Sequence, residues 1–229
     1  MRKVFSPDMR LSDMLDMNYN LVQVISRVGI ELKHSGLRVV DACAFAGIDP
    51  ATFVLISNVY SFPDYTPSPE EVASADVKDI IRYLRGSHAY YMGIALSDLE
   101  SSFDALVEPC DENQKKVIIK FFLEYKNELE KHFAREEEEV FPYVESLLGG
   151  HRPEGYSIVD FEEYHEDVDA KIEDMKNIVM KYLPDVCAED MKMWILLSLY
   201  HLRDDLRRHT YVEDCILVPI VKKLEGNGR

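Results

Sequence analysis

The chain of 229 residues is 47% hydrophobic, enough to bury a core, and has only ten glycines and ten prolines. This composition excludes a disordered chain and favours long helices over a sheet-rich fold. The formal charge of −16 disfavours nucleic-acid binding, because affinity for a phosphate backbone depends on Lys and Arg. No apolar run is as long as a membrane span, so we expect a cytoplasmic protein with no membrane partner.

A small helical domain is expected over residues 1–62. Apolar residues recur there at helical spacing in three stretches. The stretches are 14–30, 39–46 and 51–60. The second and third resemble a helix-turn-helix, but the third contains no Lys or Arg. A recognition helix needs basic residues, so we expect no nucleic-acid partner.

A linker is predicted over residues 63–69, where three prolines disfavour helix. Residues 70–229 then contain four long segments of helical periodicity, with Ser68 and Asp111 as plausible N-caps. The segments are approximately 70–104, 112–147, 157–183 and 187–225. Four long amphipathic helices with short connections predict an all-α fold, an up-down-up-down four-helix bundle preceded by the small domain.

The second and fourth segments contain the same phrase, a histidine and a glutamate four residues apart with a proline six residues further on. It is His132-x-x-x-Glu136-x5-Pro142 in one and His209-x-x-x-Glu213-x5-Pro219 in the other, offset by 77 residues. The same offset relates His88 to His165. The repetition indicates that one helical hairpin has been duplicated within the chain.

These repeated residues have the chemistry and the spacing of metal ligands. Residues four apart on a helix lie on nearly the same face, so each pair can present an imidazole and a carboxylate to one point. Six such ligands are too many for one tetrahedral zinc but suit two octahedral ions bridged by the carboxylates. Mixed imidazole and carboxylate ligation favours iron, with manganese or zinc as substitutes. The predicted metal ligands are His88, His132, Glu136, His165, His209 and Glu213.

The repeat assigns His88 and His132 to one ion and His165 and His209 to the other. A ferritin-like site would need two Glu-x-x-His pairs, and only Glu162-x-x-His165 has that spacing. Asp169, four residues after His165, is either a seventh ligand or an acceptor that orients His165.

Several neighbouring polar residues are interpreted as bystanders. In the acidic run 136–139 only Glu136 is in register, so the other three are expected on a solvated face. His201 is rotated away from the ligand face, which favours a supporting or core role. The cysteines at 43, 110, 187 and 215 have no C-x-x-C spacing and are expected to be buried free thiols.

Residues 75–222 contain an isolated histidine followed by a His-x-x-x-Glu pair, and then the same pattern a second time. This order resembles the hemerythrin-type, or HHE cation-binding, domain. Oxygen-carrying hemerythrins have a further histidine where this chain has Asp169. The site therefore resembles more closely that of the di-iron proteins that repair iron–sulfur clusters. Residues 28–49 are similar to the small domain before the bundle in that family. Its adjacent cysteines would fall near Lys33 and His34 and are absent here.

The resemblance implies a cytoplasmic di-iron protein of nitrosative or oxidative stress, with O2 or NO as ligand and damaged iron–sulfur proteins as partners. Two alternatives stay open. One is a gas or redox sensor that signals through the N-terminal domain, and the other is iron storage or buffering. The sequence leaves catalytic turnover and a homodimer open as well.

Overall fold

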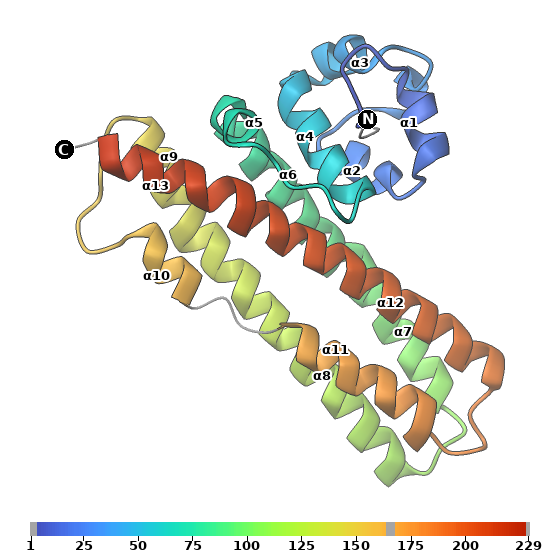
Figure 1. Ribbon diagram of the computed structural model, residues 1–229. Coiled ribbons are helices and arrows are strands. Elements are labelled where there is room, and N and C mark those ends of the chain that lie inside the picture. Colours follow the sequence, from blue (N-terminus) through green and yellow to red (C-terminus); the bar gives the residue numbers. More distant parts are fainter. Residues whose placement is uncertain (1–3, 164–167, 228–229) are drawn as a thin grey trace. The chain divides into compact units, whose positions relative to one another are not determined.

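The computed structural model of the chain describes residues 4–163 and 168–227, and helices dominate both ranges (Figure 1). In these ranges the only bridge of β type is an isolated one between Arg10 and Arg38. The prediction of an all-α fold is therefore confirmed. No single helix among the described residues is both long and apolar enough to cross a membrane, although the bent pair α3 and α4 passes on length and composition.

In the described part of the chain, seven helices run from the N-terminus to the one that carries His88. They are α1 (Leu11–Met17), α2 (Leu21–Arg27), η1 (Leu32–His34), α3 (Val39–Ala46), α4 (Pro50–Ser61), α5 (Pro69–Ser74) and α6 (Val77–Tyr90). The remaining elements are η2 (Tyr91–Ala95), α7 (Leu96–Val107), α8 (Glu112–Arg135), η3 (Glu136–Val140), α9 (Phe141–Leu148), α10 (Ile158–Glu163), α11 (Val168–Asn177), η4 (Ile178–Tyr182), α12 (Glu189–Val212), η5 (Glu213–Leu217) and α13 (Val218–Asn227).

The predicted long helices are present, with several refinements. The predicted segment 70–104 is interrupted by a break at 75–76. Each of the other three segments corresponds to three consecutive helical elements. The stretch 14–30 forms two helices, α1 and α2, separated at Asn18, whose side chain binds the Asn20 amide. Ser68 and Asp111 both cap their helices with reciprocal capping boxes, as expected.

The chain forms two compact units. The first contains residues 1–87, 140–163 and 208–229, and the second contains 88–139 and 164–207. The boundary predicted between residues 62 and 70 stays a prediction.

In the first unit, the N-terminal helices share one hydrophobic core with chain segments far along the sequence. Phe53 and Ile56 of α4 belong to the same buried cluster as Phe141 of α9 and Leu217 of η5. Residues 52–60 of α4 are all buried. The side chains of α4 therefore serve mainly in the core of the first unit.

The second unit is a four-helix arrangement with its own core. Buried apolar residues from α7, α8, α11 with η4, and α12 form one cluster, which includes Phe103, Phe122, Met175 and Leu199. The connections 108–111 and 183–188 are short, and short connections join antiparallel neighbours.

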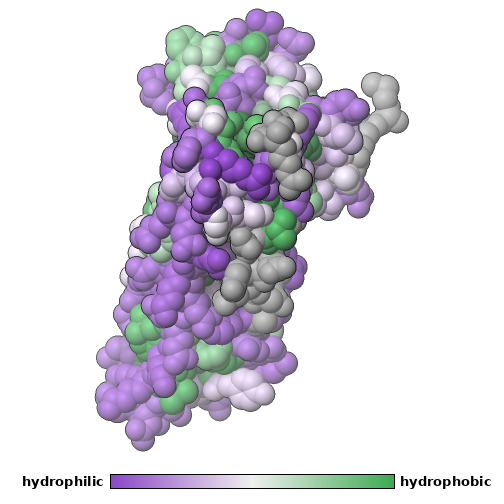
Figure 2. Space-filling view, turned by 90° about the vertical axis from the view of Figure 1, so that its left-hand side faces the viewer, coloured by the Kyte–Doolittle hydropathy of each residue, from purple (hydrophilic) through white to green (hydrophobic). Residues whose placement is uncertain are grey.

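Hydrophilic residues predominate on the face of the molecule drawn in Figure 2, with apolar residues in small groups between them. This agrees with the composition, in which 30% of the residues are charged.

Four of the short elements are π-helical turns, and two of them begin at predicted ligands. η3 starts at Glu136 and η5 starts at Glu213. One residue separates the end of each turn from a proline, which is Pro142 after η3 and Pro219 after η5. Proline lacks an amide hydrogen and its ring collides with the carbonyl four residues earlier, so a widened turn relieves the clash without ending the helix. The repeated proline of the sequence phrase thus shapes the backbone at both glutamates.

Candidate metal centre

His88 and Glu136 meet in the second unit, although 48 positions of sequence separate them. His88 lies in the last turn of α6, and its Nε2 is 2.9 Å from Glu136 Oε2. His88 is 5% exposed and Glu136 is 1% exposed. An imidazole and a carboxylate are thereby held together away from bulk water.

His132 reaches the other oxygen of the same carboxylate. It lies one helical turn before Glu136 in α8, and its Nε2 is 2.8 Å from Glu136 Oε1. The Phe133 ring packs against both histidines. The His88 ring stacks on it with the ring centroids 4.4 Å apart, and the His132 ring meets it edge to face at a centroid distance of 5.6 Å. Each oxygen of one glutamate therefore faces a different imidazole.

The repeat places an equivalent pair in the first unit. His209 Nε2 lies 3.2 Å from Glu213 Oε1, and both side chains are at most 1% exposed. The pair occupies the end of α12 and the first residue of η5, as His132 and Glu136 occupy the end of α8 and the first residue of η3. The duplicated phrase has thus produced duplicated local geometry.

These distances fit two ligands of a shared metal as well as they fit a hydrogen bond. Two neighbouring ligands of an octahedral ion, with bonds of about 2.1 Å at right angles, are roughly 3 Å apart. The three His–Glu distances of 2.9, 2.8 and 3.2 Å match that spacing. Imidazole nitrogen and carboxylate oxygen are also the donors that iron, manganese and zinc accept.

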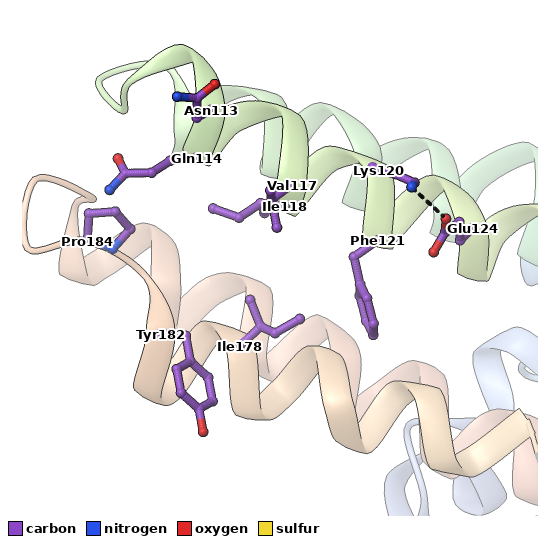
Figure 3. A pocket seen from close by; sticks show the side chains of 10 residues that line it. All are labelled: Asn113, Gln114, Val117, Ile118, Lys120, Phe121, Glu124, Ile178, Tyr182 and Pro184. Carbon is purple, nitrogen blue, oxygen red and sulfur yellow. Dashed lines mark ion pairs between the residues drawn. The ribbon is translucent and has the colours of Figure 1, made fainter.

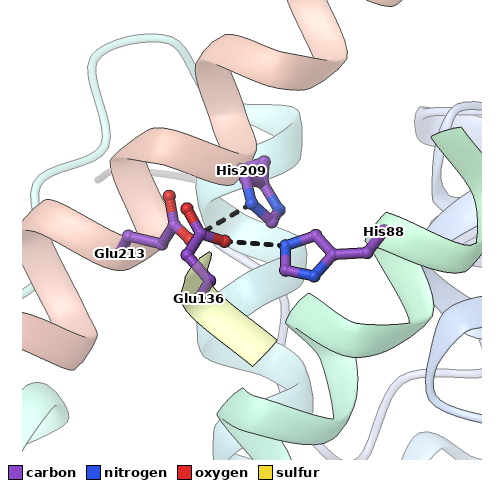
Figure 4. Close-up of side chains that lie close together, drawn as sticks. All are labelled: His88, Glu136, His209 and Glu213. Carbon is purple, nitrogen blue, oxygen red and sulfur yellow. Dashed lines mark ion pairs between the residues drawn. The ribbon is translucent and has the colours of Figure 1, made fainter. Parts of the chain in front are cut away.

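His88 and Glu136 in the second unit, and His209 and Glu213 in the first, are buried residues of the kind that could hold a metal ion. Figure 4 draws the four side chains, with dashed lines marking the His–Glu pairs. His132 joins the first pair through its contact with Glu136. Five of the six predicted ligands are therefore described, and His165 lies outside the described residues. Asp169 belongs to α11, but its side chain is likewise not described.

A sequence model described as Hemerythrin HHE cation binding domain matches residues 79–221. The chain belongs to this family. Among curated proteins, no match to the chain was found. The family match and the His/Glu group together support metal-ion binding by this hemerythrin-domain chain.

Glu137, which was expected on a solvated face, contacts a predicted ligand of the hemerythrin-type site. Glu137 Oε1 lies 2.8 Å from His88 Nδ1, and its side chain is 34% exposed. A proton on Nδ1 donated to this carboxylate leaves the lone pair of Nε2 free for a metal. The expectation of three solvated glutamates after Glu136 was therefore wrong for Glu137. Register along one helix could not find it, because the contact is made with a different helix.

The other histidines of the hemerythrin-domain chain lie apart from this group. His201 is exposed on α12, so the expected core role is wrong, because its face of the helix points to solvent. His34 stacks on Phe45 at 4.5 Å. His151 is exposed in the loop before α10.

Proposed function

We propose that the chain is a non-haem di-iron protein of the nitrosative or oxidative stress response that acts in the repair of damaged iron–sulfur clusters. The observation that carries the metal part is the Glu136 carboxylate, whose two oxygens face His88 and His132. A carboxylate approached from both sides suits a ligand shared between metal ions. The duplicated pair His209 and Glu213 supports a second half-site.

Iron bound by this ligand set would supply redox chemistry and an affinity for NO and O2. The chain's own residues supply the setting. Phe133 and Tyr91 stack at 5.6 Å beside the His88 ring, which limits water around the ligands. Glu137 holds the orientation of His88. The buried carboxylates provide the negative charge that offsets the charge of two cations.

Metal analysis of the purified chain, together with anaerobic absorption spectra before and after NO and O2, tests the metal assignment. Two irons per chain, with spectral changes on adding either gas, are expected. One zinc per chain and no spectral response would contradict it.

Recovery of iron–sulfur enzymes in cells tests the repair function. After a pulse of NO, cells that lack the gene should recover the activity of a cluster-dependent dehydratase more slowly than cells that carry it. A gene copy encoding Glu136→Ala should fail to restore recovery, while a Glu138→Gln copy should restore it. Equal recovery with and without the gene would reject repair and leave the metal site untouched.

A sensor remains the second candidate, and one observation favours it. Val140 ends the turn η3 that Glu136 begins, and Phe141 follows it. Both residues share a buried core with the N-terminal helices. Leu217, at the end of the turn that Glu213 begins, belongs to the same core. Both glutamates are therefore followed along the chain, within five residues, by residues that belong to the same core as residues 1–62. Iron storage has no such supporting feature, since the site provides for two ions per chain.

A further inference from the structure

Two cysteines that the proposed metal chemistry does not use lie against each other in the second unit. Cys110 is in the connection that follows α7, and Cys187 is in the connection that precedes α12. Their sulfur atoms are 3.3 Å apart, and both residues are buried. They are separated by 77 residues, the offset that relates His132 to His209. The internal duplication therefore explains why two thiols occupy equivalent places and meet.

The backbone holds both thiols in defined turns. The Cys110 amide donates to the Val107 carbonyl at 2.9 Å, and the Cys187 amide donates to the Pro184 carbonyl at 3.0 Å. A disulfide bond is about 2.05 Å long, so closing the gap requires each sulfur to move by well under 1 Å.

Solvent reaches the segments that contain the two thiols. The residues on either side of each cysteine, Pro109 and Asp111, and Val186 and Ala188, are exposed. A groove of about 590 Å³ between α8 and η4 is lined at one end by Asn113, Gln114 and Pro184, which lie within four residues of the two cysteines (Figure 3). A small oxidant therefore reaches the surface of both connections.

We propose that Cys110 and Cys187 form a reversible disulfide when the protein encounters a hydroperoxide. One cysteine, as thiolate, attacks the peroxide; an S–O bond forms, the O–O bond breaks, and the departing hydroxide takes up a proton to give water. The second thiolate then attacks the sulfenic sulfur; the S–S bond forms, the S–O bond breaks, and a second water leaves. In sum, two thiols lose two electrons and two protons, and hydrogen peroxide is reduced to two waters.

The bond would close a ring around residues 111–186. This segment runs from α8 to η4 and contains His132, Glu136 and His165 among the predicted ligands. Closing a long loop restricts the unfolded chain and raises the stability of the fold. Oxidation would thereby restrain a loop that carries three of the six proposed ligands. The cysteine proposal is independent of the identity of the metal.

Peptide mapping of the full-length protein tests the pair directly. Protein treated with hydrogen peroxide, then alkylated under denaturing conditions and digested with trypsin, should yield the peptide 86–115 linked to the peptide 182–192, each of which contains one cysteine. Dithiothreitol should release both. The double variant Cys43→Ser/Cys215→Ser should give the same linked product.

Two further results are decisive. The linked form should melt several degrees higher than the reduced form, and Cys110→Ser should abolish this shift while its reduced form keeps a melting temperature near that of reduced wild type. Recovery of both peptides fully alkylated after peroxide would overturn the proposal. Oxidation of single thiols to sulfinic acid, or linkage to Cys43 or Cys215, would overturn it as well.

Discussion

Glu136 is 1% exposed and lies within 2.9 Å of two imidazoles, on a helix whose next residue is another glutamate. Removing a carboxylate from water costs several kcal/mol unless positive charge accompanies it. A protein that keeps this side chain and its repeat counterpart Glu213 buried therefore holds an arrangement that cations stabilise. The residue-scale predictions follow from this electrostatic argument.

Replacing Glu136 by alanine should lower the metal content of the chain, because the carboxylate that faces two imidazoles is lost. The metal-free variant should be at least as stable as metal-free wild type, since a buried charge has been removed. Metal analysis and thermal denaturation of both forms measure the two effects. A metal-free variant that unfolds several degrees below wild type would indicate that Glu136 is structural instead.

Glu137→Gln should weaken metal binding by about 10–100-fold, because the acceptor that orients His88 becomes a poorer one. Competition with a chelator of known affinity measures the change. Glu138→Gln is the matched control, since it removes an equal charge from the same run at an exposed position. Equal weakening in both variants would mean that net charge, and not the contact with His88, is responsible.

Cys187 should react with iodoacetamide slowly at neutral pH and about tenfold faster for each pH unit up to about 10. Burial, together with the hydrogen bond to Cys110, raises the pKa of this thiol to about 11. The neutral thiol is therefore favoured in the fold, and its contribution to stability is complete below the ordinary thiol pKa and is lost as pH rises toward 11. Mass-spectrometric labelling rates of reduced protein measure the effect. Rates that do not change between pH 7 and 10 would contradict it.

At the scale of elements, α6 approaches α2 so closely that one position accepts only glycine. A Cβ atom at Gly86 would lie 2.5 Å from the Arg27 carbonyl oxygen and 2.9 Å from its Cα. Both are backbone atoms, which cannot rotate away as a side chain can. Arg27 is itself held in place by a bond to Tyr60 Oη at 2.8 Å. The close approach lies two residues before His88, in the helix that carries this ligand.

Gly86→Ala should therefore destabilise the protein by about 1–3 kcal/mol, through forced separation of the two helices. Gly93→Ala is the matched control. An added Cβ there meets nothing within 4 Å, so the change should be neutral or slightly stabilising. Urea denaturation of the two variants measures the difference. Similar stabilities for both would show that α2 and α6 can separate without cost.

At the scale of the whole molecule, residues 1–62 are part of a core as well as a predicted domain. Phe5, Val24 and Phe53 belong to the same buried cluster as Tyr83, Phe141 and Val221. Removal of the N-terminal helices would expose the apolar residues of α6, α9 and α13 that they cover. Exposed apolar area of this kind promotes aggregation.

A chain that begins at residue 70 should thus melt well below the full-length protein and should self-associate. Thermal denaturation followed by circular dichroism, and size-exclusion chromatography, measure these effects. The apolar cluster built from Phe103, Phe122 and Leu199 lies in the second unit and is untouched by the truncation. Partial helical content is therefore expected to remain. A truncated monomer with unchanged stability would show that the N-terminal helices are an independent appendage.

Local rules on the sequence were enough for the helices, their caps and the paired ligands. Ser68 and Asp111 cap their helices because capping depends on residues three apart. His132 meets Glu136, and His209 meets Glu213, because a spacing of four fixes them on one helix face. The 77-residue repeat then extended each local pair to its counterpart.

Contacts between distant segments needed the tertiary structure. Glu137 meets His88 and Cys110 meets Cys187 across 49 and 77 positions, where no helical register connects the partners. The shared core of α4, α9 and η5 is likewise a matter of which apolar faces meet, and many pairings satisfy the same periodic pattern. By itself, the sequence determined the type of each element and the metal-binding chemistry of the repeated pairs. Only the packing of those elements decided which carboxylate orients a ligand and which two thiols can react with each other, because these depend on distances between helices that local spacing does not encode.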